Sequence, residues 1–381
     1  FGLYIHIPFC TKKCPYCDFN TYAVKNIPEE EYTNALLIEL ENAKQNKVWS
    51  NREVNTIYFG GGTPSIFNKL SIEKILNKVN SCFSVSSDAE ITLEANPGDL
   101  TFSDLASLKE ANINRLSFGV QTLNDFHLKS LGRWHDSKQA MAIFNDARRT
   151  NFKNINLDLM FSLPEQKIED LEDDLNKYIE LNPEHISTYE LTIEKGTPFF
   201  SRYKTLTKPL PDETINYDMY SLIIEKLTNN NFSWYEVSNF GKKGYLSKHN
   251  TSYWKNKDYL GIGAGAHSFY KNDNNKTAFR SSNIANIDDY LKAKKINNFT
   301  AWSEELNQSK IFNELIALSL RTQYGISIKK LANFVDLNKL DNVLNDLKNE
   351  KLIEIIDNKI ITTQKGRYLA DSVASAIIDF I

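Results

Sequence analysis

Three cysteines near the start of the chain have a spacing that suits metal-cluster chemistry. Cys10, Cys14 and Cys17 form a C-x3-C-x2-C pattern directly after an apolar stretch. Three thiolates on one loop are one fewer than the four ligands of an ordinary iron–sulfur cluster or structural zinc site. A 4Fe-4S cluster held by three cysteines keeps one iron open, and an open iron can bind a small molecule. The spacing therefore predicts a cluster that takes part in chemistry.

A disulfide framework or a structural zinc site fits these cysteines less well than a cluster does. Disulfide frameworks are typical of short secreted chains, whereas this chain has 381 residues and four cysteines. A structural zinc site needs a fourth Cys or His, and the alternation of the predicted strand around the nearby His6 points that side chain elsewhere. The fourth cysteine, Cys82, stands alone, as is typical of a small buried hydrophobic residue.

Charge and hydropathy limit the class of protein. The formal net charge is −3, so no strong field draws the chain to nucleic acid or to an anionic membrane. No segment approaches the roughly 20 apolar residues of a membrane span, and the start of the chain does not resemble a signal peptide. We therefore expect a cytoplasmic protein with no nucleic-acid partner and no membrane span of its own.

Apolar β-like runs alternate with amphipathic helical patterns over the first half of the chain. Strands are predicted at Gly2–Ile7, Thr56–Phe59, Glu90–Ala95, Arg115–Gly119, Ile155–Met160 and Ile186–Glu190. Helices are predicted at Glu30–Gln45, Ser71–Val79, Ser103–Ala111, Ser137–Thr150 and Glu169–Glu180. Six strands joined by helices predict parallel pairing with right-handed crossovers. The fold class is therefore α/β, a partial (β/α)6 TIM-like barrel whose chemistry lies at the carboxyl ends of the strands.

Polar and glycine-rich landmarks recur at those strand ends. Gly60-Gly61-Gly62 follows the second strand, Glu94 ends the third, Gln121 follows the fourth and Asp158 lies in the fifth. A glycine run lets the backbone approach a ligand closely, although taken alone it is more often a tight turn. A carboxylate at the end of an apolar strand needs a partner, which is either a charged ligand or a salt bridge.

The sequence changes character near residue 300. A helical pattern spans Ser303–Arg321, two shorter helical patterns follow, and Leu352–Ile361 is predicted to be a hairpin with Asp357-Asn358 at its tip. This order is typical of a winged-helix-like unit, but the stretch has no clustered basic face. We expect residues 1–300 to form the barrel with added strands and loops, and residues 301–381 to form a small C-terminal helical domain that acts as a lid or docks a partner.

Together these motifs resemble the radical S-adenosylmethionine (SAM) proteins of the oxygen-independent coproporphyrinogen III oxidase-like family. The resemblance is carried by Tyr4–Cys17, Phe59–Pro64, Leu93–Pro97, Leu116–Gln121 and Leu157–Pro164, and it extends over nearly the whole chain. Within the family the chain is most similar to the heme chaperone branch. The oxidases carry a further cysteine two residues after the third ligand, where this chain has Phe19, and they have a long extension before the cysteine loop.

The resemblance implies which residues hold the cofactors. It implies that Cys10, Cys14 and Cys17 bind a 4Fe-4S cluster whose open iron takes the amino and carboxylate groups of SAM. The implied SAM contacts are Tyr4, Tyr16, Gly61, Gly62, Thr63, Glu94, Gln121, Arg133 and Asp158. Arg133 would meet the SAM carboxylate, although an arginine in such a position is otherwise typical of a surface ion pair.

One later segment resembles the HNxxYW motif that the heme chaperone branch associates with heme. It comprises His249, Asn250, Tyr253 and Trp254. A neutral imidazole is a good axial ligand for heme iron, Asn250 would fix its tautomer, and the two aromatic rings would pack on the porphyrin. The alternative is a histidine that caps a turn beside packed aromatic rings. If His249 is not the ligand, the next candidates are His267 and Cys82.

The expected function is that of a heme chaperone-like radical SAM protein that binds a 4Fe-4S cluster, SAM and heme. Its implied partners are heme and apo-hemoproteins, respiratory-chain proteins among them. Binding to such a recipient would place the protein at the membrane surface. The alternatives are an oxygen-independent coproporphyrinogen III oxidase, a radical SAM heme methyltransferase, and a non-catalytic binding module stabilised by the cluster. The sequence leaves the catalytic residues, the enzymatic activity and a homodimeric state open.

Overall fold

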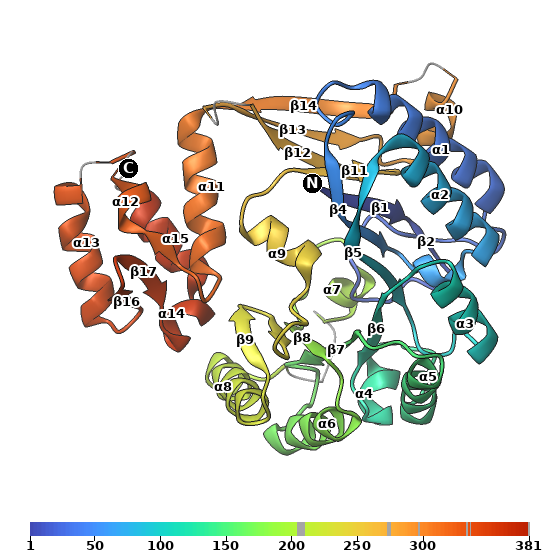
Figure 1. Ribbon diagram of the computed structural model, residues 1–381. Helices are drawn as coiled ribbons and strands as arrows, with labels where there is room; N and C mark the ends of the chain where they lie inside the picture. Colours follow the sequence, from blue (N-terminus) through green and yellow to red (C-terminus); the bar gives the residue numbers. More distant parts are fainter. Residues whose placement is uncertain (204–209, 273–275, 296–297, 333, 336, 380–381) are drawn as a thin grey trace.

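One sheet of twelve strands dominates the part of the chain that the structure describes, and its middle is parallel (Figure 1). The computed structural model describes residues 1–381 except 204–209, 273–275, 296–297, 333, 336 and 380–381. The central strands lie side by side in the order β1 (Gly2–Ile7), β4 (Glu53–Gly61), β5 (Ser84–Ala95), β6 (Arg115–Gln121), β7 (Ile155–Phe161) and β8 (His185–Glu190). All of these neighbours pair in parallel. Each predicted strand lies within one of them, so the predicted α/β fold is confirmed.

Helices cover the outer side of the parallel strands (Figure 1). The helices that follow successive strands are α1 (Glu29–Gln45), α2 (Lys69–Cys82), α3 (Phe102–Glu110), α4 (Asp125–Ser130), α5 (Ser137–Arg149), α6 (Ile168–Leu181), α7 (Pro198–Tyr203) and α8 (Glu213–Asn229). The five predicted helices correspond to five of these. Capping boxes define two starts, at Thr101 with Asp104 and at Asp136 with Gln139. Among the described residues, no helix is long and apolar enough to cross a bilayer.

Antiparallel strands extend the sheet on both sides of its parallel middle. On one side lie β11 (Tyr259–Ile262), β12 (His267–Lys271), β13 (Ala278–Asn283) and β14 (Thr300–Leu306), and on the other lie β10 (Asn239–Gly241) and β9 (Ser233–Glu236). Strand β11 pairs in parallel with β1, and β12 to β14 continue as an antiparallel meander. Two short helices accompany them, α9 (Lys248–Trp254) and α10 (Ile287–Ala293).

Strand β14 corrects the helix predicted at Ser303–Arg321. The first residues of the predicted helix belong to β14 and pair with β13, with Ser303 opposite Ser281. The helix α11 (Gln308–Leu320) begins only after them. Asn307 marks the change, because its side chain accepts a hydrogen bond from the Lys310 N–H at 2.9 Å as an N-cap. Pairing with β13 thus overrides the helical pattern of the preceding residues.

The C-terminal segment builds a second hydrophobic core. That core contains Phe312, Ile316, Leu340, Val373 and Ile377, and belongs to α11, α13 (Leu337–Asn349) and α15 (Ala370–Ile378). The other elements of this segment are β15 (Ile326–Ser327), α12 (Ile328–Leu331), β16 (Ile353–Ile356), β17 (Lys359–Thr362) and α14 (Gln364–Tyr368). The boundary at residue 300 stays a prediction, because β14 still belongs to the large sheet.

The predicted hairpin is present in this segment. Strand β16 pairs antiparallel with β17, and Asp357 and Asn358 connect them. Both residues have positive φ, 49° and 60°, as a two-residue turn of the I′ type requires. Asp and Asn tolerate this conformation better than most residues, so the turn could be predicted from these two residue types.

Candidate functional site

The cysteine loop lies at the carboxyl end of β1. Two short strands, β2 (Phe9–Cys10) and β3 (Tyr22–Ala23), pair in parallel and close the loop. Cys10 and Cys14 are buried, Cys17 is half-buried, and none of them forms a disulfide. A hydrogen bond of 3.1 Å from the Cys17 N–H to the Cys14 carbonyl turns the backbone between them. The loop therefore presents three reduced thiols from one short segment.

Each cysteine sulfur has a polar neighbour from a different part of the site. Thr63 Oγ1 donates to Cys10 Sγ at 3.5 Å, Arg133 Nη1 donates to Cys14 Sγ at 3.3 Å, and Thr21 Oγ1 lies 3.8 Å from Cys17 Sγ. Burial raises the pKa of the Cys10 thiol, so a thiolate there needs donors or metal. Hydrogen bonds to cluster sulfur are one of the means by which proteins tune iron–sulfur clusters.

The donor set fits an iron–sulfur cluster better than a single ion. Within the described ranges, no group of three His, Cys, Asp or Glu side chains is placed to hold one metal ion. In a 4Fe-4S cluster each cysteine bonds a different iron, so the sulfurs belong further apart. Gly62 borders the loop closely, since a Cβ added there would lie 3.0 Å from Cys10 Sγ and 2.5 Å from the Phe9 carbonyl oxygen. A residue larger than glycine would press on the loop that holds the thiols.

The glycine turn after β4 is fixed by a buried carboxylate. Gly61 has φ 115°, and its N–H donates to Glu94 Oε2 at 3.1 Å. Tyr58 donates its hydroxyl to Glu94 Oε1 at 2.7 Å. Burial raises the pKa of Glu94 to about 7, despite these two hydrogen bonds. The predicted neighbours Gly61 and Glu94 thus touch, and the carboxylate is held at the strand ends.

Arg133 holds the cysteine loop to the end of β6. Besides Cys14, it donates from Nη2 to Asn96 Oδ1 at 2.5 Å and to the Gly119 carbonyl at 2.6 Å. Its Nε is buried and has no partner among the described residues. The arginine is therefore no surface ion pair, and its Nε–H is a buried donor that the described residues leave without a partner.

Gln121, Asp158 and Tyr16 lie around this centre at different depths. Gln121 ends β6 with φ 72°, a strained conformation for a residue with a side chain. Asp158 accepts from Asn156 Nδ2 at 2.8 Å, and burial raises its pKa to about 6. Tyr16 packs on Leu131 and its apolar neighbours. The cysteine loop and the strand ends thus bring the predicted SAM residues to one side of the barrel, whereas their contacts with SAM stay predictions.

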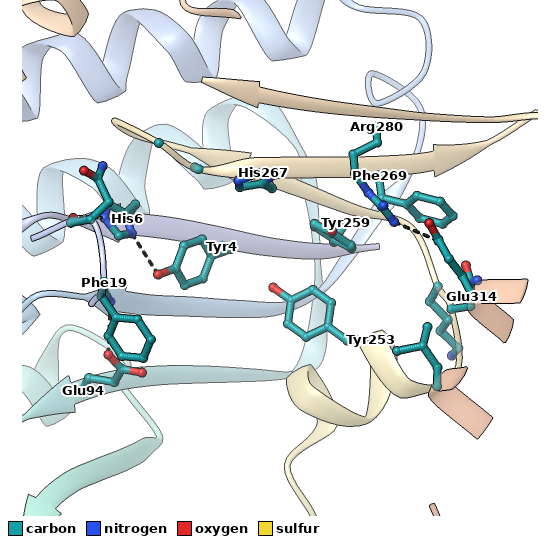
Figure 2. A pocket seen from close by; sticks show the side chains of 17 residues that line it. Tyr4, His6, Phe19, Glu94, Tyr253, Tyr259, His267, Phe269, Arg280 and Glu314 are labelled. Atoms are coloured by element: carbon teal, nitrogen blue, oxygen red, sulfur yellow. Dashed lines mark hydrogen bonds and ion pairs between the residues drawn. The ribbon is translucent and has the colours of Figure 1, made fainter. Parts of the chain in front are cut away.

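A cavity of about 660 Å³ opens beside the glycine turn (Figure 2). Its walls are aromatic on several sides, from Tyr4, Phe19, Tyr253, Tyr259 and Phe269. Its polar lining includes His6, Gly61, Glu94, His267, Arg280 and Glu314. Volume and lining are those of a site for a small, largely apolar molecule. We call this space the aromatic pocket.

Several residues of the aromatic pocket were not predicted from the sequence. Phe269, Arg280 and Glu314 come from β12, β13 and α11, and no pattern linked these segments to the barrel. His6, which was not expected to be a ligand beside the cysteines, lines the pocket, and its Nε2 lies 3.0 Å from the carbonyl oxygen of Asn20. The meander residues join the pocket because β11 pairs with β1, which brings the meander to the open side of the parallel strands.

His249, the predicted heme ligand, is committed to hydrogen bonds within the protein. It lies in α9 with 1 % of its surface exposed. Its Nδ1 lies 2.8 Å from Thr56 Oγ1 and its Nε2 lies 2.8 Å from the Tyr253 hydroxyl. Its ring also stacks on Tyr58 at 4.9 Å. Burial lowers the pKa of His249 to about 3. In this arrangement neither ring nitrogen is available to iron, so axial ligation by His249 does not fit the structure.

The rest of the predicted heme motif is divided between two cavities. Tyr253 lines the aromatic pocket, whereas Trp254 lines a separate cavity between α9 and the C-terminal segment. Asn250 does not hold the imidazole, because Thr56 and Tyr253 do so. Glu90 fixes the start of α9 by accepting from the backbone N–H groups of Lys248 and His249 at 3.1 and 3.0 Å. Helix α9 is therefore held against the barrel strands by these hydrogen bonds, and of its residues only Tyr253 lines the aromatic pocket.

Comparisons with known proteins agree with this architecture. The model of the radical SAM superfamily matches residues 4–178. The chain is 37% identical to the heme chaperone HemW of Bacillus subtilis over 98% of both chains, and 35% identical to that of Lactococcus lactis over 96% of this chain and 91% of the relative. It is 34% identical to the mouse protein named radical S-adenosyl methionine domain-containing protein 1, mitochondrial, over 86% of this chain and 74% of the relative.

A solved structure shows the same fold. The radical SAM enzyme coproporphyrinogen III oxidase (HemN) of Escherichia coli superposes with a TM-score of 0.84 at 24% identity, over 100% of this chain and 90% of the other. At this identity the likeness concerns the fold. It confirms the predicted TIM-like radical SAM barrel, with which the C-terminal helical domain is consistent.

Proposed function

This chain belongs to the HemW family of radical SAM proteins, and on that premise we propose that it binds a 4Fe-4S cluster, SAM and heme and delivers the heme to apo-hemoproteins. The observation that carries the proposal is the juxtaposition of two features. Three reduced cysteines lie on one loop, and a largely aromatic pocket opens beside the same strand ends. A cluster site and a site for a flat apolar cargo are thus neighbours.

The cluster half of the site would be held by the cysteine loop. Cys10, Cys14 and Cys17 would ligate the cluster, and Thr63 and Arg133 would donate to its sulfur ligands, as they do to the thiols. A bound cluster supplies single electrons to SAM. Gly61 and Gly62 would let SAM approach the backbone, and the Arg133 Nε is the unused donor for its carboxylate.

The heme half would be the aromatic pocket, apart from the side that Tyr4, Gly61 and Glu94 line, which would face SAM. Aromatic side chains bind a porphyrin face through their large apolar area. Phe19 lines this pocket and is 65% exposed, so its ring is accessible to a ligand. In the oxidases the resemblance places a cysteine at this position. An apolar ring there favours cargo binding over oxidation of coproporphyrinogen.

Anaerobic reconstitution with iron and sulfide, followed by separate titrations with heme and SAM, tests the proposal. We expect stoichiometric binding of both and no conversion of coproporphyrinogen III to protoporphyrinogen IX, even with a reductant present. Formation of that product at more than one turnover per chain would instead establish the oxidase alternative. Transfer of a methyl group from SAM to heme would establish a methyltransferase. A cluster without heme or SAM binding would leave a non-catalytic module.

A further inference from the structure

One histidine differs from all the others in its hydrogen bonding. The chain has six histidines, all within the described residues. Five are buried, and each of these has at least one ring nitrogen close to a polar partner: His6, His127, His135, His185 and His249. His267 is exposed and its ring forms no hydrogen bond in the described structure; its ring neighbour is Trp302, edge-on at 6.0 Å. Among the described histidines, His267 is therefore the one whose ring nitrogens are free of hydrogen bonds and open to a ligand.

His267 shares a wall of the aromatic pocket with a phenylalanine and an arginine. In the β12–β13 ladder, Phe269 lies opposite Arg280 and His267 lies opposite Ser282. Alternate residues of a strand and directly paired residues point to the same face of a sheet. His267, Phe269 and Arg280 all line the aromatic pocket, and Figure 2 shows their side chains on its meander wall. The Arg280 guanidinium lies over the Phe269 ring, 5.6 Å from its centroid, and the His267 imidazole lies further along the same wall.

We propose that His267 is the axial ligand of the heme iron and that Arg280 binds one of the heme propionates. This assignment rests on the proposed function and deepens it by naming the groups that hold the cargo. A neutral imidazole supplies the lone pair that iron needs, and the ring of His267 has no hydrogen-bonding partner in the described structure that would occupy it. Phe269 is 2% exposed and supports this wall beside Arg280. The imidazole and the guanidinium are therefore the groups that the wall offers to an iron and to a carboxylate.

Arg280 already holds a carboxylate of this protein. Its Nη2 donates to Glu314 Oε2 on α11 at 2.8 Å, and Figure 2 marks this ion pair at the border of the pocket. A propionate would share or replace this partner, because an arginine accommodates carboxylates in a planar, two-pronged geometry. Glu314 thus keeps the guanidinium oriented toward the pocket before the cargo arrives.

The test of His267 compares heme titrations of the full chain, its His267→Ala variant and its His249→Ala variant. We expect the wild-type chain and His249→Ala to share one Soret spectrum. His267→Ala should bind heme roughly tenfold to a hundredfold more weakly, with a different Soret maximum, and added imidazole should restore the original spectrum. Far-ultraviolet circular dichroism and cluster content check that each variant is folded.

Three outcomes separate the assignment from the proposed function. An unchanged spectrum and affinity in His267→Ala would overturn the assignment while leaving heme binding intact. If a folded His249→Ala loses the Soret band while His267→Ala keeps it, the axial ligand of the heme iron would be His249 in α9. If the wild-type chain does not bind heme at all, the proposed function itself fails, and the assignment fails with it.

Arg280 is tested with a cargo that lacks free carboxylates. Arg280→Gln should weaken heme binding several-fold without moving the Soret band, because the iron ligand is unchanged. Heme dimethyl ester, whose propionates are blocked, should bind the wild-type chain and Arg280→Gln equally. Glu314→Gln serves as the matched control, since it removes the ion pair but keeps the arginine. If Arg280→Gln weakens the ester as much as heme, the arginine shapes the pocket and does not bind a propionate.

Discussion

Two regions of this molecule each contain a histidine but differ in how their polar side chains are hydrogen-bonded. The first, which we call the open edge, comprises Cys10, Cys14, Cys17 and His267: three thiols outside any disulfide and an imidazole ring without a hydrogen bond in the described structure. The second, the closed interior, comprises Glu39, Thr56, Glu90, His249 and Tyr290, whose side chains are buried and hydrogen-bonded to one another or to backbone. The buried groups of the closed interior hold one another or the backbone, whereas the thiols and the His267 ring keep their lone pairs for a metal or a ligand.

Two glycine turns show the same contrast at the two sides of β1. The Gly61 N–H donates to Glu94, and the Gly263 N–H donates to Glu39 at 2.9 Å. Both glycines have positive φ, 115° and 108°, and both carboxyl groups have a pKa raised to about 7 by burial. Yet Glu94 lines the aromatic pocket, whereas Glu39 faces α10 and accepts from Tyr290. The residue types and the hydrogen bond are alike, so the packing around each turn decides which one meets a ligand.

The largest effect is expected at the open edge. Replacing Cys10, Cys14 or Cys17 with Ala should abolish the brown absorbance of the reconstituted cluster, because two thiolates do not hold it. The chain should remain folded, since these thiols support no disulfide. Absorbance spectra with iron and sulfide analysis measure the cluster, and Cys82→Ala is the matched control that should keep it. Stoichiometric iron and sulfide in the triple variant would show that the cluster is bound elsewhere.

The next effect belongs to the closed interior. His249→Ala should lower the free energy of unfolding of the apo chain by roughly 3–5 kcal/mol, because it creates a cavity and leaves the buried hydroxyls of Thr56 and Tyr253 without their partner. Urea denaturation followed by circular dichroism measures this loss. His267→Ala is the control from the open edge and should change stability by less than about 1 kcal/mol. If His249→Ala lowers the free energy of unfolding only slightly, the hydrogen bonds of His249 do not hold α9 against the barrel strands as proposed.

Much of the fold and of the cluster site was predictable from the sequence, because both depend on local patterns. Alternating strand and helix signals indicated the six parallel strands, and the spacing of Cys10, Cys14 and Cys17 identified the loop. The SAM residues that were tied to strand ends, such as Gly61 and Glu94, do come together.

The aromatic pocket was not predictable in the same way. It depends on the pairing of β11 with β1 and on the placement of α11 beside β13, which join segments distant in sequence. The motif around His249 was also misleading, because a histidine between aromatic rings looks the same whether it binds iron or supports a helix. Its burial and its two partners distinguish these roles, and neither is visible in the residue pattern.

A pH dependence is expected from the closed interior. Burial raises the pKa of Glu39 from 4.5 to about 7, although Tyr290, Gly263 and Asn283 donate to it. The folded chain therefore binds a proton that the unfolded chain releases between these values, so this group's contribution to stability falls as pH rises from about 4.5 to 7. Glu39→Gln should remove about 3 kcal/mol of this decline, since one pKa unit corresponds to about 1.4 kcal/mol. Urea denaturation at a series of pH values measures it, and an unaltered pH profile in Glu39→Gln would contradict the raised pKa.

The smallest effect is expected for Asn250, and it tests where the closed interior ends. The residue follows His249 in α9 but is only half-buried, and its backbone N–H donates to the cap Ser247. Because Thr56 Oγ1 lies 2.8 Å from His249 Nδ1, Asn250→Ala should change the free energy of unfolding by no more than about 0.5 kcal/mol and leave the Soret band in place. Thr56→Val, which keeps the shape and removes the hydroxyl, should cost about 1–3 kcal/mol because a buried imidazole nitrogen loses its partner. Urea denaturation of the two variants in parallel makes the comparison. If Asn250→Ala lowers the free energy of unfolding more than Thr56→Val does, the imidazole of His249 depends on the Asn250 amide, as the sequence motif first suggested. Helix α9 would then belong to the ligand site and not to the closed interior.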